Sequence, residues 1–207
     1  MVFISGHQTL GRGQVGAKWL DKPDKNALFS VVFPTHNMPI RHLSQWNMWF
    51  SAQVVKALRE MIKLPILLKW PNDILLFDKK IGGLLIESSL QGNQVNHIIA
   101  GSGINVGYHP VEIAHSDCLQ NHRQISVDEV IAGILQQLNN QPFQPNSQKA
   151  YHDLLSGYHE WRTYIINRRK TLGYLDKIDD AGSAHIRLEG ETVPRVFRHK
   201  EVEWCYD

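Results

Sequence analysis

One long helical pattern among many short strand-like runs is the feature that most constrains this fold. Apolar residues recur every three or four positions over residues 43–62, which predicts a single amphipathic helix. Apolar, β-branched and aromatic runs predict strands at residues 2–5, 26–33, 66–70, 74–77, 81–90 and 95–100. We predict an α+β fold in which helices cover a mixed β-sheet.

The second half of the chain predicts two further helices and then a small β module. A capping-box pattern at residues 126–129 opens one helix, and apolar spacing predicts another over residues 148–161. Residues 106–124 are rich in His and Pro and predict a long loop. Short runs then predict antiparallel strands at residues 173–178, 184–188, 193–197 and 201–204. We therefore expect a first domain at residues 1–163 and a small second one at residues 164–207.

Charge and cysteine content exclude several classes of protein. The 207 residues carry 22 Lys+Arg against 20 Asp+Glu, a net charge of +2, which argues against binding nucleic acid through overall charge. No run reaches the roughly 20 apolar residues that span a bilayer, and the first residues lack the pattern of a signal peptide. Cys118 and Cys205 form no Cys-x-x-Cys motif, so we assign no metal ligands. Two thiols in a chain of this length fit a reducing, cytoplasmic location.

The sequence Gly-Arg-Gly-Gln-Val-Gly at residues 11–16 matches the dinucleotide-binding pattern G-x-G-x-x-G. A strand is predicted before it, but Pro23 and the lack of a helical apolar period exclude the helix that must follow. We therefore reject the Rossmann interpretation. What remains is a glycine-rich loop with two cations, Arg12 and Lys18, which favours anion binding, and a solvated hairpin loop is the alternative.

Three polar residues interrupt an apolar stretch in Lys-Trp-Pro-Asn-Asp, at residues 69–73. An unpaired buried charge is costly, so Lys69, Asn72 and Asp73 must be either paired or functional. A structural Lys69–Asp73 pair is the alternative to a site, and the Trp-Pro turn would hold these side chains in place.

Two more segments place polar side chains beside glycines. Lys80 precedes Gly82 and Gly83 at a predicted strand entry, where a flat ligand can approach and the lysine can meet a carboxylate or phosphate. An edge lysine beside a β-bulge is the alternative, and Lys79 is expected to be solvated. Asn105, in Gly-Ser-Gly-Ile-Asn, offers a donor and an acceptor suited to a purine or ribose, or else bonds its own backbone in a turn.

Taken in this order, the motifs resemble those of the catalytic domain of biotin protein ligases, which share a superfamily with lipoate ligases. The matching segments are Gln-Thr-Leu-Gly-Arg-Gly-Gln at residues 8–14, Lys-Trp-Pro-Asn-Asp at 69–73, Lys-Ile-Gly-Gly-Leu-Leu-Ile-Glu at 80–87 and Gly-Ile-Asn-Val at 103–106. The resemblance covers nearly the whole chain, and it implies that residues 164–207 are the small SH3-like β-barrel that follows the catalytic domain in this family. With no DNA-binding winged helix in the sequence, we expect the single-function type.

The resemblance implies an ATP-dependent ligase that converts biotin to biotinyl-5′-adenylate and transfers it to a lysine of the biotin carboxyl carrier domain of acetyl-CoA carboxylase. Mg²⁺ would share in neutralising the phosphates. A lipoate or octanoate ligase or transferase on the same scaffold is one alternative. An inactive homologue that only binds ligand or carrier is another. The sequence leaves both a monomer and a homodimer open.

The resemblance also implies roles for individual residues. Lys80, Arg12 and Asp73 are expected to be catalytic, with Lys80 contacting the biotin carboxylate and the phosphate, and Asp73 orienting or deprotonating the acceptor lysine. The expected biotin-binding residues are Gln8, Gly11, Arg12, Gly13, Gln14, Lys80, Gly82 and Gly83. The expected nucleotide-binding residues are Lys69, Asn72, Ser102, Ile104 and Asn105.

The chain departs from the family pattern in two places. Val15 and Ala17 stand where many members have Arg or another polar residue, so we expect weaker retention of the adenylate. Family members also carry an upstream segment whose Ser-Thr-Asn motif supplies hydroxyls to the biotin ring. This sequence does not include that segment, so we expect either an upstream start codon or a shortened homologue.

Overall fold

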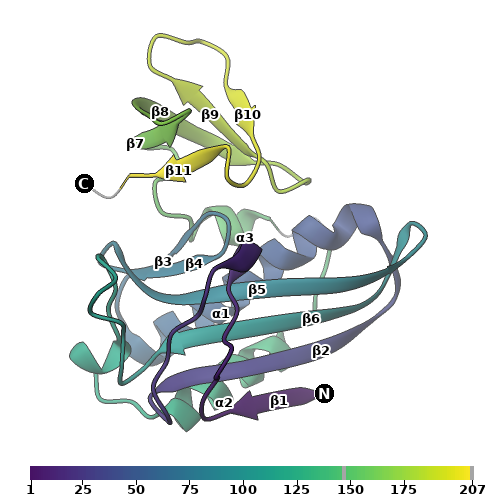
Figure 1. The fold of residues 1–207 in the computed structure, drawn as a ribbon. Helices are drawn as coiled ribbons and strands as arrows, with labels where there is room; N and C mark the ends of the chain where they lie inside the picture. The colour runs from purple at the N-terminus through teal and green to yellow at the C-terminus, as the bar shows by residue number, and fades with distance from the viewer. Residues whose placement is uncertain (146–147, 206–207) are drawn as a thin grey trace.

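The computed structural model describes residues 1–145 and 148–205, except for the side chain of residue 15 (Figure 1). Its larger part is built on a six-stranded sheet in the order β1-β2-β6-β5-β4-β3. These strands are β1 (Val2–Ser5), β2 (Asn26–Pro39), β3 (Ile66–Lys69), β4 (Asp73–Leu76), β5 (Lys79–Gln91) and β6 (Gln94–Asn105). The expectation of a mixed sheet is wrong, because every pairing among them is antiparallel. Short hairpins connect β3 to β4, β4 to β5 and β5 to β6, and a hairpin can join only antiparallel strands.

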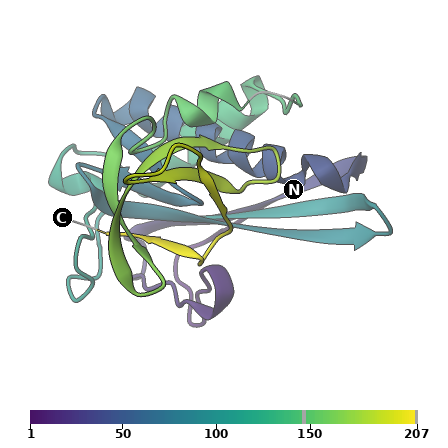
Figure 2. The same ribbon diagram turned by 90° about the horizontal axis from the view of Figure 1, so that it is seen from above.

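The helices cover one face of this sheet, and the N-terminal loop crosses the other (Figure 2). They are α1 (Leu43–Ile62), α2 (Val127–Asn140) and α3 (Lys149–His152). Under α1, Trp46 stacks on Phe50 with ring centroids 5.5 Å apart, and Phe33 of β2 meets both rings edge-on. The predicted capping box opens α2, where the side chain of Ser126 accepts the N–H of Glu129. Among the described helices, none combines the length and the apolar character needed to cross a membrane.

A second, five-stranded antiparallel sheet follows, in the order β10-β9-β8-β7-β11. It comprises β7 (Trp161–Ile166), β8 (Arg169–Ile178), β9 (Ala184–Leu188), β10 (Arg195–Phe197) and β11 (Val202–Trp204). We call this part the C-terminal module. Its strand pairing is that of an open sheet, so the closed SH3-like barrel stays a prediction. The domain boundary at residue 163 stays a prediction as well. The module lies over the β3–β4 end of the larger sheet (Figure 1).

Two local expectations fail for identifiable reasons. The helix expected over residues 148–161 ends at His152, because the chain then runs beside β3: the N–H of Leu68 donates to the carbonyl of Leu154, and the N–H of Ser156 donates to that of Leu68. The strand expected over residues 26–33 is longer than predicted, because β2 continues to Pro39 through a register irregularity. Prolines are tolerated in strands at such irregularities.

A buried pair of amides ties the sheet to the loop that follows β6. The Nδ2 of Asn26 donates to the Oδ1 of Asn105 at 3.1 Å and to the carbonyl of Tyr108 at 3.2 Å. The Nδ2 of Asn105 in turn donates to the carbonyl of Asp117 at 3.0 Å. Because both asparagines are almost fully buried, these bonds have no water to replace them.

Replacing Asn105 tests this structural role. Asn105→Ala removes one of the two acceptors of the buried Asn26 amide and the side-chain donor to the carbonyl of Asp117, so we expect the free energy of unfolding to fall by about 1–3 kcal/mol. Urea denaturation followed by tryptophan fluorescence measures the loss. Asn139→Ala, at an exposed position on α2, is the control and should change stability by less than about 0.5 kcal/mol. Equal stability of the two variants would contradict the assignment.

Candidate active site

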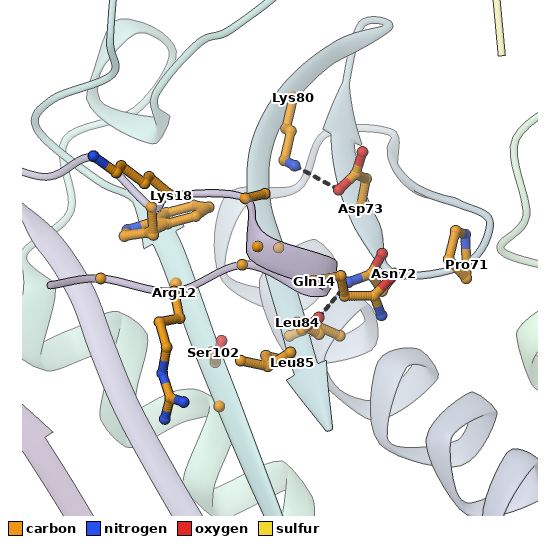
Figure 3. Close-up of a pocket in the computed structure, with 18 of the residues that line it drawn as sticks. Arg12, Gln14, Lys18, Pro71, Asn72, Asp73, Lys80, Leu84, Leu85 and Ser102 are labelled. Carbon is orange, nitrogen blue, oxygen red and sulfur yellow. Dashed lines mark hydrogen bonds and ion pairs between the residues drawn. The ribbon is translucent and has the colours of Figure 1, made fainter. Parts of the chain in front are cut away.

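A cavity of about 1040 Å³ lies against the sheet face opposite the helices, between the N-terminal loop and the C-terminal module. Strands β2, β3, β4, β5 and β6 contribute to its lining, together with residues 7–14 and 16–19 and the β10–β11 turn. Figure 3 shows lining side chains from the N-terminal loop, the β3–β4 turn, β4, β5 and β6. The cavity therefore joins segments from both ends of the chain.

A carboxylate between two lysines occupies one end of the cavity. The Oδ1 of Asp73 lies 2.6 Å from the Nζ of Lys80 (Figure 3), and its Oδ2 lies 3.6 Å from the Nζ of Lys69. Lys69 and Asp73 face each other across the β3–β4 hairpin, while Lys80 arrives from β5. All three side chains are more than half buried, and Asp73 compensates charge on both lysines.

The surroundings of Lys69 ease the loss of its proton. Burial lowers the pKa of the Lys69 ammonium, and the negative charges of Asp73 and Glu203 oppose that shift. Of the two lysines beside Asp73, Lys69 is the more deeply buried: 14% of its side chain is exposed, against 35% for Lys80. An incoming anion would restore the stability of its charged form.

The glycine-rich loop forms a small hairpin over the cavity. The N–H of Gly13 donates to the carbonyl of Ala17 at 2.7 Å, and the N–H of Trp19 donates to that of Gly11 at 3.0 Å. Arg12 projects from this hairpin with its side chain largely exposed, 3.9 Å from the Oε1 of Glu87 on β5. A pair this open is weakly held, so the guanidinium is available to a ligand anion.

Glycines make the floor of the cavity flat. Along β6, Ile98, Ala100 and Ile104 point into the core, whereas Gly101 and Gly103 lie on the cavity side. The ring of Trp19 rests on this floor, and a Cβ on Gly103 would come within 2.7 Å of it. Any side chain at Gly103 would therefore push the indole away from the sheet.

The C-terminal module supplies a wall of the cavity. His199 and Lys200, in the β10–β11 turn, line it together with Val202, Glu203 and Trp204. The indole of Trp70 joins the two parts, because its Nε1 donates to the carbonyl of Gly182 at 3.0 Å while its ring meets His199 edge-on at 6.1 Å. Burial and the charge of Lys200 lower the pKa of the His199 imidazole, and Asp73 opposes them. Neither spacing nor motif pointed to these residues.

Most of the predicted site residues converge on the cavity. Its lining contains Gln8, Gly11, Arg12, Gly13, Gln14, Lys69, Asn72, Asp73, Lys80, Gly83 and Ser102. Three predicted residues, Gly82, Ile104 and Asn105, are absent from it. Asn72 also has a structural contact, because its Nδ2 donates to the carbonyl of Leu84 (Figure 3). The β-bulge considered as an alternative for Lys80 is present beside it, where the β4–β5 register shifts between Ile74 and Leu75.

Comparison with known proteins agrees with this arrangement. A model of the biotin/lipoate A/B protein ligase family matches residues 2–105, half of the chain. The bifunctional ligase/repressor BirA of Bacillus subtilis is 30% identical over 109 residues, which cover 53% of this chain and 33% of that protein. The human biotin–protein ligase is 35% identical over 115 residues, or 51% of this chain and 15% of that protein. The chain thus matches a third or less of the length of these two relatives.

Similarity to a solved structure extends over the whole chain. The structure of biotin protein ligase from Aquifex aeolicus in complex with biotin and ATP superposes with a TM-score of 0.77 at 25% identity. That alignment covers 100% of this chain and 89% of the other. The segments matched by the family model include the glycine-rich loop, both lysines and Asp73. The chain therefore belongs to the biotin/lipoate A/B protein ligase family.

Proposed function

We propose that this protein uses ATP to convert biotin to biotinyl-5′-adenylate and then transfers the biotinyl group to a lysine of a biotin carboxyl carrier domain. The observation that carries this proposal is the pairing of Asp73 with Lys80 and Lys69 in a cavity floored by glycines. The Aquifex aeolicus relative, which holds biotin and ATP, supports the choice of substrates. The name biotin–[acetyl-CoA-carboxylase] ligase, carried by a Mycobacterium tuberculosis relative, supports the choice of carrier.

The first step requires cations because it joins two anions. A carboxylate oxygen of biotin attacks the α-phosphorus of ATP, and the bond to the β-phosphate breaks to release pyrophosphate. Lys80 and Lys69 lie within reach of one carboxylate in the free protein, and Arg12 adds a guanidinium from the loop. In this proposal they neutralise the substrate carboxylate and the phosphates, and that stabilisation grows as charge develops in the transition state.

The second step requires a base. The acceptor amine attacks the acyl carbon of the adenylate, AMP leaves, and the attacking nitrogen must lose a proton. Asp73 is the carboxylate among the lysines of the site, and once substrate anions pair with Lys80 and Lys69 it is released to accept that proton. We propose this role for Asp73 and substrate-binding roles for the other predicted residues in the lining.

Mg²⁺ fits the oxygen donors of the cavity. This ion is usually held by one or two carboxylates together with substrate phosphates. Glu87 and Glu203 are carboxylates of the lining, and Asp73 is a third that the lysines already engage. We propose that Mg²⁺ enters with ATP, with Glu87 or Glu203 as its protein ligand. It would neutralise phosphate charge alongside the lysines.

The C-terminal module is part of this proposal. We propose that residues 164–207 act as an SH3-like module. Its β10–β11 turn would close the end of the cavity where Lys69 and Asn72 are proposed to bind the nucleotide. Its contacts with Trp70 and its place in the cavity lining support that role.

Two neighbouring lysines provide a matched test of the site. Lys80→Ala removes the cation closest to Asp73, so we expect the rate of biotin attachment to fall by at least about 100-fold. Lys79→Ala is the control, since Lys79 is largely exposed and is absent from the cavity lining. The assay incubates each protein with biotin, ATP, Mg²⁺ and a carrier domain and detects biotinylated lysine with streptavidin.

The same assay separates the alternatives. Attachment of lipoate or octanoate but not biotin would replace the proposal with the related ligase activity. Binding of biotin and ATP without any labelled carrier would indicate a homologue that only binds ligand. Equal activity of the two lysine variants would contradict the assignment of Lys80.

Asp73→Asn separates the two steps. We expect transfer from preformed biotinyl-5′-adenylate to fall by at least about 100-fold, because the proton acceptor is lost. Pyrophosphate release in the absence of carrier should fall less. Raising the pH should recover part of the transfer rate, since the acceptor lysine then deprotonates in solution. Equal losses in both steps, with no recovery at high pH, would mean that Asp73 only positions Lys80.

A further inference from the structure

The loop between β6 and α2 gathers three groups of the kinds that bind transition metals. Ligand atoms of His109, Asp117 and Cys118 lie within 4.8 Å of one another. Asp117 and Cys118 are buried, with 4% and 3% of their surface exposed, and His109 is half-buried. None of the three lines the cavity described above, so the cluster is separate from the proposed active site.

The hydrogen bonds around His109 favour a tautomer that can bind a metal through Nε2. The hydroxyl of Ser116 has one hydrogen, which it donates to the carbonyl of Pro110 at 2.7 Å. The 2.9 Å contact between Ser116 Oγ and His109 Nδ1 must then be donated by the imidazole. In the neutral ring this leaves the lone pair on Nε2. Metal-binding histidines are oriented in the same way, by donating their other N–H to a neighbouring acceptor.

The carboxylate of Asp117 is held in place by other donors. Its Oδ1 accepts the N–H of Cys118 at 2.8 Å and the Nδ2 of Asn121 at 2.6 Å. Its Oδ2 lies 3.0 Å from His122 Nε2 and 3.8 Å from the Nζ of Lys79. Oδ2 keeps room for a further bond, because each carboxylate oxygen offers about two lone-pair directions and Lys79 at 3.8 Å lies beyond hydrogen-bond distance. The Lys79 side chain is largely exposed and can move aside for a cation.

We propose that His109 Nε2, the Asp117 carboxylate and the Cys118 sulfur form a site for Zn²⁺ or a similar transition metal, with water as the fourth ligand. Imidazole, carboxylate and thiolate are the three protein donors that tetrahedral Zn²⁺ uses. Bond lengths of about 2.0–2.3 Å place such ligands roughly 3.3–3.8 Å apart, so side-chain rotations must close the cluster by about 1 Å. Binding releases the thiol proton to solvent.

Metal binding at this site would affect Lys80 through backbone hydrogen bonds. The N–H of Lys80 donates to the carbonyl of His115 at 2.7 Å, and the N–H of Asp117 donates to the carbonyl of Lys80 at 3.0 Å. Residues 115–117 of the loop therefore pair with the start of β5, and Asp117 is itself one of the proposed ligands. A metal that orders the loop should slow hydrogen exchange at the Lys80 amide.

Cobalt titration of the tag-free full chain tests the proposal. Co²⁺ is the probe, because thiolate coordination gives a charge-transfer absorption and tetrahedral geometry gives intense visible bands. We expect saturation at about one Co²⁺ per chain, displacement by Zn²⁺ and slower exchange of the Lys80 amide. Cys118→Ser should remove the charge-transfer band, and His109→Ala should weaken binding at least tenfold. Mg²⁺ should not compete, since it prefers oxygen ligands.

Matched controls keep the result interpretable. Cys205→Ser removes the other thiol and His115→Asn changes another histidine of the same loop, and both should bind Co²⁺ as the unaltered chain does. Circular dichroism of each variant in EDTA shows whether it folds. A charge-transfer band that survives Cys118→Ser, or the absence of stoichiometric binding by the folded, reduced chain, would overturn the site. The biotinylation assay does not enter this test, so the two proposals fail independently.

Discussion

The rest of the site depends on one carboxylate, that of Asp73. Two lysines from different strands are brought into a partly buried cavity, and their repulsion would open the β3–β4–β5 corner if Asp73 did not lie between them. The same pairing keeps both ammonium groups directed at the position proposed for the substrate anion. Substrate binding would then exchange one carboxylate for others, and Asp73 would become available as a base. The Asp73 carboxylate would thus compensate the lysine charges in the free protein and act as a base when substrate is bound.

The sheet separates the scaffold from the chemistry. On its helix side, large rings and branched side chains of α1, β2 and β6 pack into a dry core. On its other side, β5 and β6 carry Gly83, Gly101 and Gly103, which leave the backbone accessible to a flat ligand. The alternation of side chains along a strand permits this division, because each residue faces only one side. Family membership and the superposition on a biotin protein ligase agree with a floor built in this way.

Sequence reasoning located the local features and missed the tertiary ones. Helix α1 and the capping box of α2 followed from spacing over a few turns, and the lysines and Asp73 were visible because they interrupt apolar strands. His199 and Glu203 could not be found in this way, since their place in the cavity depends on how the C-terminal module packs. The helix expected over residues 148–161 failed because pairing with β3 outweighed apolar spacing. Asn105 occurs in a recognisable motif, but its amide is occupied by Asn26 and Asp117.

The indole of Trp70 mechanically couples the β3–β4 turn to the C-terminal module. It lies within the turn that carries Asn72 and Asp73, yet its hydrogen bond and its ring contact are both made to the C-terminal module. A rotation of the module would therefore pull on the segment that holds the proposed base. Substitutions in the last strands, far from any recognised motif, would in this way alter the proposed reaction without touching a substrate. For protein engineering, the module is best treated as part of the proposed active site and exchanged only together with the turn that contacts it.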